Sequence, residues 1–166
     1  MLLVRTNPSQ SVDPEVWTAR ADLRTDADRV LRALTDPVAI AAWAPISFEV
    51  AGLAGRRLRA GSRERVSGSI AGIRAAFDVE VRNADTDGLE LVASGPVSLD
   101  VAYRFREHDE GVTVEAAVAV RRQDGLSAQL LQAAVAALLN AGALNSALRR
   151  LSASVCSPVE AELLAA

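Results

Sequence analysis

Three side chains in this sequence could carry acid–base or nucleophilic chemistry, and each is the single residue of its type: Tyr103, His108 and Cys156. There is no lysine. His108 lies in an acidic turn, where we expect a solvated side chain at a hairpin tip. Cys156 has no basic neighbour that would activate a thiolate. Tyr103 alternates with polar residues and shares a strand face with Val101 and Phe105, so we expect it to point into the protein.

The carboxylates of the predicted strands fall on the opposite, outward face. They are Asp78, Glu80, Asp100 and Glu115, and they are interleaved with Arg74, Arg82, Arg104 and Arg106. Cross-strand ion pairs on a wet face explain them. Proton transfer at neutral pH requires a group with a pKa near 7, whereas an unperturbed tyrosine has a pKa of about 10. We therefore expect little general acid–base catalysis, with Tyr103 as a hydrogen-bond donor and the best single catalytic candidate.

Several classes of function are disfavoured by composition. A formal net charge of −3 gives no field that would gather nucleic acid. One histidine and one cysteine make no transition-metal ligand set, and no phosphate loop or dinucleotide motif is present, so neither metal nor cofactor is expected. A single cysteine and an N-terminus without a long apolar run favour a cytoplasmic location.

Alternation of apolar and polar residues predicts a meander of strands. The predicted strands are 16–23, 48–51, about 59–67, 73–81, 89–94, 97–105 and 112–120. A glycine-containing loop is expected at 52–55 and a glycine turn at 68–72. Because consecutive strands joined by short turns become antiparallel neighbours, we expect one wet and one buried face.

Two short helices are predicted after the first strand. Thr25 is the expected N-cap of the first, and apolar residues follow it at helical spacing. Asp36 and Pro37 end that helix and start the second, with Asp36 as cap and Pro37 at the first helical position. The second helix is expected to end near Trp43.

The uncharged stretch 125–148 predicts one long helix over 127–155, about 42 Å in length. Ser127 is the expected N-cap, and Leu126 is expected to pack on Leu131 as a hydrophobic staple. The apolar stripe of this helix would contain Leu131, Ala134, Val135, Leu138, Ala141, Leu148 and Val155. Polar amides at Asn140 and Asn145 would be costly in lipid, so no membrane span is predicted. This helix is expected to cover the buried face of the sheet.

The predicted order is strand, two short helices, about six strands and one long helix. It describes an α+β domain over 13–156, in which a curved antiparallel sheet of about seven strands closes around the helix. Residues 1–12 and 157–166 are expected to be tails. A chain of 166 residues is long enough to bury a core without metal or disulfide support.

The run Leu34-Thr35-Asp36-Pro37, followed by Trp43-Ala44-Pro45, resembles the START-related superfamily called SRPBCC, and in particular its bacterial polyketide cyclase/dehydrase-like members. The resemblance covers about residues 15–155. It implies the helix-grip, or birch-pollen-allergen, fold with an apolar cavity between sheet and long helix. Relatives use this cavity for lipids, sterols, plant hormones, polyketides or aromatic substrates, and only some branches catalyse a reaction. The fold alone does not fix a function.

We therefore expect a monomer or homodimer that binds a small lipid-, polyketide- or aromatic-like molecule. Two alternatives stay open: a cyclase or dehydratase that uses Tyr103, and a protein-interaction module. Small residues on both layers permit either a tightly packed interior or a pocket, and the resemblance favours the pocket. The expected ligand contacts are Trp17, Phe77, Tyr103, Phe105 and Leu138, with Trp43 near the entrance and Asn145 either facing the cavity or capping a strand-end carbonyl.

Overall fold

The structure is a computed structural model, and it describes residues 14–51 and 57–156. The predicted tails at 1–12 and 157–166 and the predicted loop at 52–55 lie outside the described residues.

Seven strands form one antiparallel sheet in the order β1-β7-β6-β5-β4-β3-β2. Their bounds are β1 (Glu15–Leu23), β2 (Phe48–Ala51), β3 (Arg63–Ile70), β4 (Ile73–Asp85), β5 (Gly88–Ser94), β6 (Ser98–His108) and β7 (Gly111–Arg121). From β2 to β7 each strand pairs with the next one along the chain, and β1 adds to the edge of β7. The α+β class and the strand meander predicted from the alternation are confirmed.

Strand β3 begins and ends later than the sequence pattern predicts. The turn to β4 consists of Ala71 and Gly72, whose φ angles are 50° and 81°. Gly68, expected in that turn, lies inside the strand instead. A Cβ at Gly68 would come within 2.8 Å of the backbone oxygen of Ser47, so this glycine permits the close approach of β2.

The two short helices are α1 (Ala27–Thr35) and α2 (Pro37–Trp43). Asp26, not Thr25, caps α1, because its carboxylate accepts a hydrogen bond from the backbone N–H of Arg29 at 2.7 Å. Asp36 caps α2 and accepts from the N–H of Val38 at 2.9 Å, with Pro37 at the first turn as predicted.

The predicted single long helix is wrong in one respect, because it is two helices. They are α3 (Leu126–Asn140) and α4 (Ala143–Cys156), bent by 59°. Gly142 lies at the break with a φ of 87°, and its N–H bonds to the carbonyl of Leu139. A left-handed residue cannot continue a right-handed helix, and glycine adopts this conformation without steric cost.

The predicted start of α3 is also wrong. Gly125 is the N-cap residue, and no side chain caps the helix. Leu126 is 82% exposed, so it does not form the expected staple on Leu131, which is fully buried. Neither helix alone, within the described ranges, is long and apolar enough to cross a membrane, although the bent pair together reaches the length and composition.

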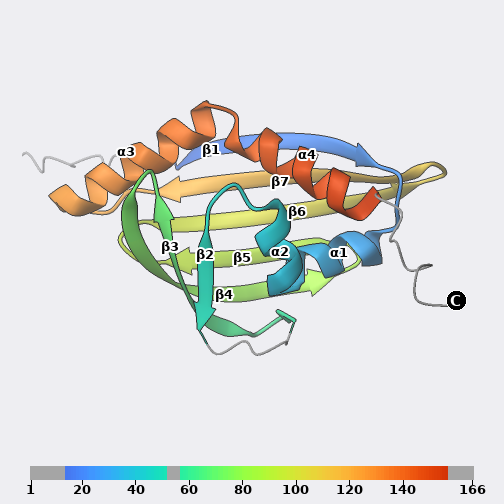
Figure 1. The fold of residues 1–166 in the computed structure, drawn as a ribbon, viewed down its shortest axis with the longest axis horizontal. Coiled ribbons are helices and arrows are strands. Elements are labelled where there is room, and N and C mark those ends of the chain that lie inside the picture. The colour runs from blue at the N-terminus through green and yellow to red at the C-terminus, as the bar shows by residue number, and fades with distance from the viewer. Residues whose placement is uncertain (1–13, 52–56, 157–166) are drawn as a thin grey trace, which may run out of the picture.

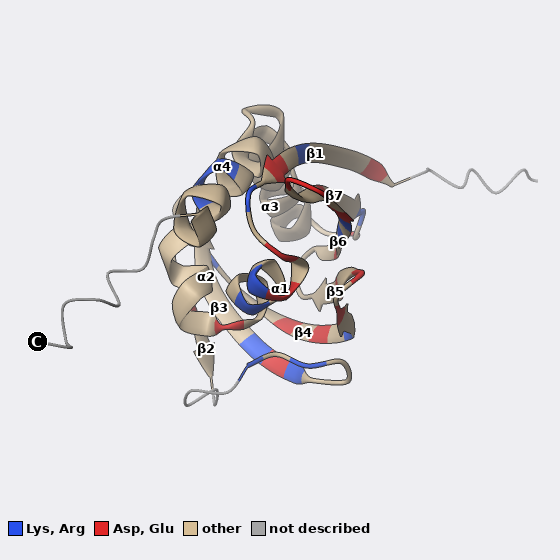
Figure 2. Ribbon diagram, turned by 90° about the vertical axis from the view of Figure 1, so that its right-hand side faces the viewer, with Lys and Arg blue, Asp and Glu red and all other residues tan. Residues whose placement is uncertain are grey.

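The helices lie on the concave side of the curved sheet (Figure 1). Helix α4 packs along β1, and α1 packs on β4, β5 and β6. Figure 2 shows the sheet curving around α1 from β1 to β4. Helix α3 contacts β3 and α4 and carries no charged residue. The concave face of the sheet is therefore the surface on which the core is built.

Candidate functional site

The register of the strands defines which side chains occupy the concave face. Directly opposed residues in an antiparallel pair share a face, so rows of side chains can be followed across the sheet. One row is Trp17, Val118, Val101, Leu91 and Val81, and the adjacent row is Val120, Leu99, Ala93, Val79 and Glu64. Both rows face the helices.

The buried residues on this face form two core clusters. One is shared with α1, α2 and α4 and contains Tyr103 and Phe105, whereas the other is shared with α3 and contains Phe77 and Leu131. Between them lie apolar side chains that face inward but are only half-buried, which we call the middle band. It consists of Trp17, Val79, Leu91, Leu99 and Val101. Trp17 packs against both clusters. The middle band is therefore an apolar part of the concave face that is not completely buried.

Tyr103 lies in the first cluster with 8% of its surface exposed. Burial raises the pKa of its phenol to about 12, because the phenolate would lose its hydration. The hydroxyl makes no hydrogen bond to a described residue. Every fully enclosed side-chain N or O atom of the described residues has a hydrogen-bond partner. Because the Tyr103 hydroxyl has none, it is not fully enclosed. Tyr103 thus offers a protonated hydroxyl to the interior over the neutral pH range.

Trp17 connects the sheet to the end of α3. Its indole Nε1 donates a hydrogen bond to Oδ1 of Asn140 at 2.8 Å. The polar end of this tryptophan is therefore satisfied by the protein, while its ring contributes to the middle band.

The other predicted contacts occupy different places. Phe77 is buried in the second cluster and half-buried Leu138 packs against that cluster, whereas Phe105 is buried in the first cluster with Tyr103. Trp43 is 7% exposed and donates through Nε1 to the carbonyl of Ala33 at 3.0 Å. It joins α2 to α1 inside the first core cluster, and its expected role near a ligand entrance stays a prediction.

Asn145 lies outside the interior. It is exposed on α4 and lines a depression of about 700 Å³ beside β1, β6 and β7. The side chains of Thr18, Ala102 and Ala117 in this depression belong to the outward faces of their strands. Asn140, not Asn145, is the amide that contacts an inward-facing ring.

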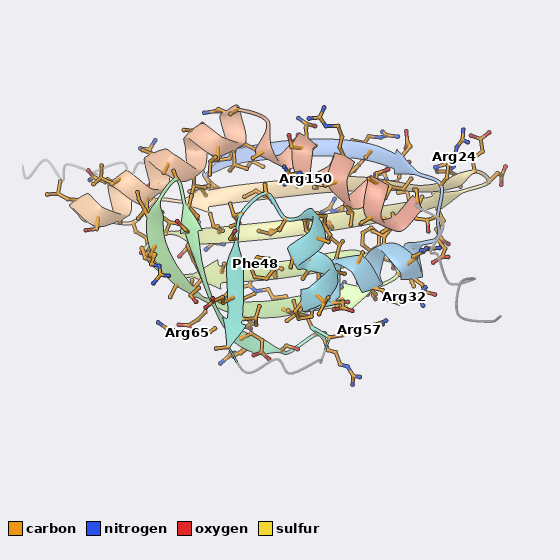
Figure 3. All side chains as sticks on the ribbon, in the orientation of Figure 1. Arg24, Arg32, Phe48, Arg57, Arg65 and Arg150 are labelled. Carbon is orange, nitrogen blue, oxygen red and sulfur yellow. The ribbon has the colours of Figure 1, made fainter. Side chains whose placement is uncertain are left out.

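Glu64 is an inward-facing carboxylate that the sequence pattern did not reveal. It pairs with Val79 across β3 and β4 and is half-buried. Its neighbours Arg63 and Arg65 face outward, where they form ion pairs with Glu80 and Asp78, each at 3.1 Å. Arg65 projects from the outside of the curved sheet (Figure 3). Glu64 itself has no hydrogen-bond or ion-pair partner among the described residues.

The predicted outward carboxylates are where the pattern placed them. Asp100 pairs with Arg121 at 2.6 Å, and Glu115 lies near Arg20 and Arg106. His108 is exposed at the hairpin tip, and its Nδ1 accepts a hydrogen bond from the N–H of Glu110. In the part of the chain that the structure describes, no three His, Cys, Asp or Glu residues gather as a metal site requires.

The architecture is that of the helix-grip fold, and solved structures with the same fold support this. Protein CV1439 from Chromobacterium violaceum superposes with a TM-score of 0.63 at 16% identity, over 87% of this chain and 99% of that one. Ara h 8.0201 gives a TM-score of 0.56 at 10% identity, over 87% and 99%. DynU16, a protein of the dynemicin biosynthetic locus, gives 0.54 at 18% identity, over 83% of this chain and 46% of that one. No protein-family model and no curated protein matches the sequence.

Proposed function

We propose that this protein binds a small apolar molecule between the concave face of the sheet and its covering helices. The observation that carries the proposal is the middle band, in which apolar side chains face inward between two packed clusters and yet are only half-buried. Ligand sites are commonly concave and lined by apolar side chains, with a few polar groups that orient the ligand. Tyr103 would supply one such group as a hydrogen-bond donor.

Membership of the START-related superfamily is part of the same proposal. The fold comparisons support the helix-grip architecture, and the position of one neighbour in a biosynthetic locus is compatible with a polyketide-like ligand. Binding is favoured over acid–base catalysis, because the raised pKa of Tyr103 makes its phenol a donor and a poor base near pH 7.

The test is a titration with the neutral fluorescent probe N-phenyl-1-naphthylamine. We expect one site with micromolar affinity. Val101 and Ala102 provide a matched pair of variants, because these adjacent residues of β6 face opposite sides of the sheet. Val101→Trp places a ring in the middle band and should weaken binding by about tenfold or more. Ala102→Trp places the same ring in the depressions on the outer face and should leave the affinity unchanged.

The opposite result, in which Ala102→Trp abolishes binding and Val101→Trp does not, would place the probe on the outer face and overturn the proposal. Complete absence of saturable binding would overturn it as well.

A further inference from the structure

We propose that Glu64 is the polar anchor of the interior and selects an apolar ligand that carries a protonated amine. This inference rests on the proposed function and adds to it the chemical class of the ligand.

The position of Glu64 follows from the register. It ends the row that passes through Val79, Ala93, Leu99 and Val120, so its Cβ is on the concave face beside the middle band. Glu64 is half-buried, whereas the side chains of Arg63 and Arg65 on either side are 78% and 64% exposed. Alternation along β3 therefore directs one carboxylate inward and both arginines outward.

The charges of the concave face are all of one sign. Among the described strand residues, the acidic and basic side chains with inward register are Glu15, Glu64 and Glu107. Glu15 is exposed at the start of β1, and Glu107 accepts a hydrogen bond from the N–H of Ala27 at 3.2 Å. No described arginine of a strand shares this face. Glu64 thus has no counter-ion from the sheet.

A carboxylate beside an apolar surface interacts with charge more strongly than one in bulk water, because the effective dielectric constant is lower. A protonated amine would give Glu64 a charge-assisted hydrogen bond, while the apolar part of the ligand covers the middle band. A hydroxyl group would gain less, and an anionic head group would be repelled. Tyr103 lies three strands away from β3 in the sheet order, so the two polar groups would hold different ends of an elongated ligand.

The test compares three ligands of equal chain length: dodecylamine, dodecanol and dodecanoate. Each displaces N-phenyl-1-naphthylamine from the wild-type protein below its micellar concentration. We expect dodecylamine to bind about tenfold to a hundredfold more tightly than dodecanol, the usual range for a hydrogen bond to a charged group, and dodecanoate to bind most weakly.

Glu64→Gln should remove the preference for the amine, so that dodecylamine and dodecanol bind with similar affinity. Glu80→Gln is the matched control, because it removes the same charge from the outer face and should keep the preference. Glu64→Arg, as a second variant, should reverse the order and favour dodecanoate.

The inference about Glu64 is overturned if Glu64→Gln retains the amine preference, or if the wild type binds dodecanoate as tightly as dodecylamine. In either case the proposed function would still hold, provided that the wild type binds the probe and Val101→Trp prevents this binding. Failure of the probe itself to bind would overturn both.

Discussion

The concave and convex faces of this sheet differ in the number and pairing of their charged side chains. On the described part of the convex face, arginines and carboxylates alternate and meet in five ion pairs. On the concave face, the described strands contribute apolar residues, one tyrosine and three glutamates. Because the same strands supply both faces, a one-residue change of position moves a side chain from solvent to core. Polar groups are therefore paired and numerous on the convex face but few on the concave face, and the few on the concave face are the candidates for ligand contacts.

The largest expected effect comes from adjacent alanines of β7. Ala116 is 2% exposed on the concave face, and Ala117 is half-buried on the convex face. Ala116→Asp should lower the free energy of unfolding by about 3 kcal/mol or more, because it buries an unpaired carboxylate. Ala117→Asp should cost less than about 1 kcal/mol. Urea denaturation measures both, and equal losses would show that the two faces are wrongly assigned.

An intermediate effect is expected from the buried phenol at high pH. The pKa of Tyr103 is about 12 in the folded protein and about 10 when unfolded, so the folded state holds the proton more tightly. The stability from this difference is complete below about pH 10 and is lost as the pH rises toward 12. The loss is about 3 kcal/mol for two pKa units.

This pH dependence can be assigned to one residue. The chain has one tyrosine and no lysine, and arginine stays protonated in this range. Tyr103→Phe should therefore flatten the decline in unfolding free energy between about pH 10 and about pH 12. An unchanged decline in the variant would mean that the phenol is not the group that titrates.

The smallest effect is expected on the convex face. Arg121→Ala removes the ion pair with Asp100, whose atoms lie 2.6 Å apart on partly exposed side chains. Such surface pairs contribute less than about 1 kcal/mol, and salt screens them. The loss measured by urea denaturation should shrink in concentrated sodium chloride. If Arg121→Ala instead lowered the free energy of unfolding by more than about 2 kcal/mol at any salt concentration, the convex ion pairs would not be weak surface pairs.

The sequence predicted the strands well because alternation and turn residues agree from β4 to β7. It failed at Gly142, because one glycine costs a helix only about 1 kcal/mol and the surrounding alanines favour continuation. It also failed at Glu64. Three consecutive charged residues from Arg63 to Arg65 suggest a solvated segment, and only pairing with β4 shows that the middle one faces inward.

The candidate site was predictable in part for a similar reason. Tyr103, Phe105 and Phe77 lie on strands with regular alternation, so their inward direction could be inferred from the pattern. Trp43 and Asn145 depend on how helices pack on the sheet. That packing follows from the bend between α3 and α4, which Gly142 alone marks in the sequence, and from the hydrogen bond between Trp43 and Ala33, which has no local sequence signal.

The two tryptophans occupy different environments, so intrinsic fluorescence can report on two parts of the protein. Trp43 is buried between α1 and α2, whereas Trp17 is half-buried and belongs to the middle band. Intrinsic emission from Trp43 should follow unfolding, and that from Trp17 should respond when the interior is occupied. With phenylalanine at position 43, quenching by acrylamide would report on access to Trp17 alone. The emission of Trp43 and that of Trp17 would thus distinguish unfolding from the proposed ligand binding without an added label.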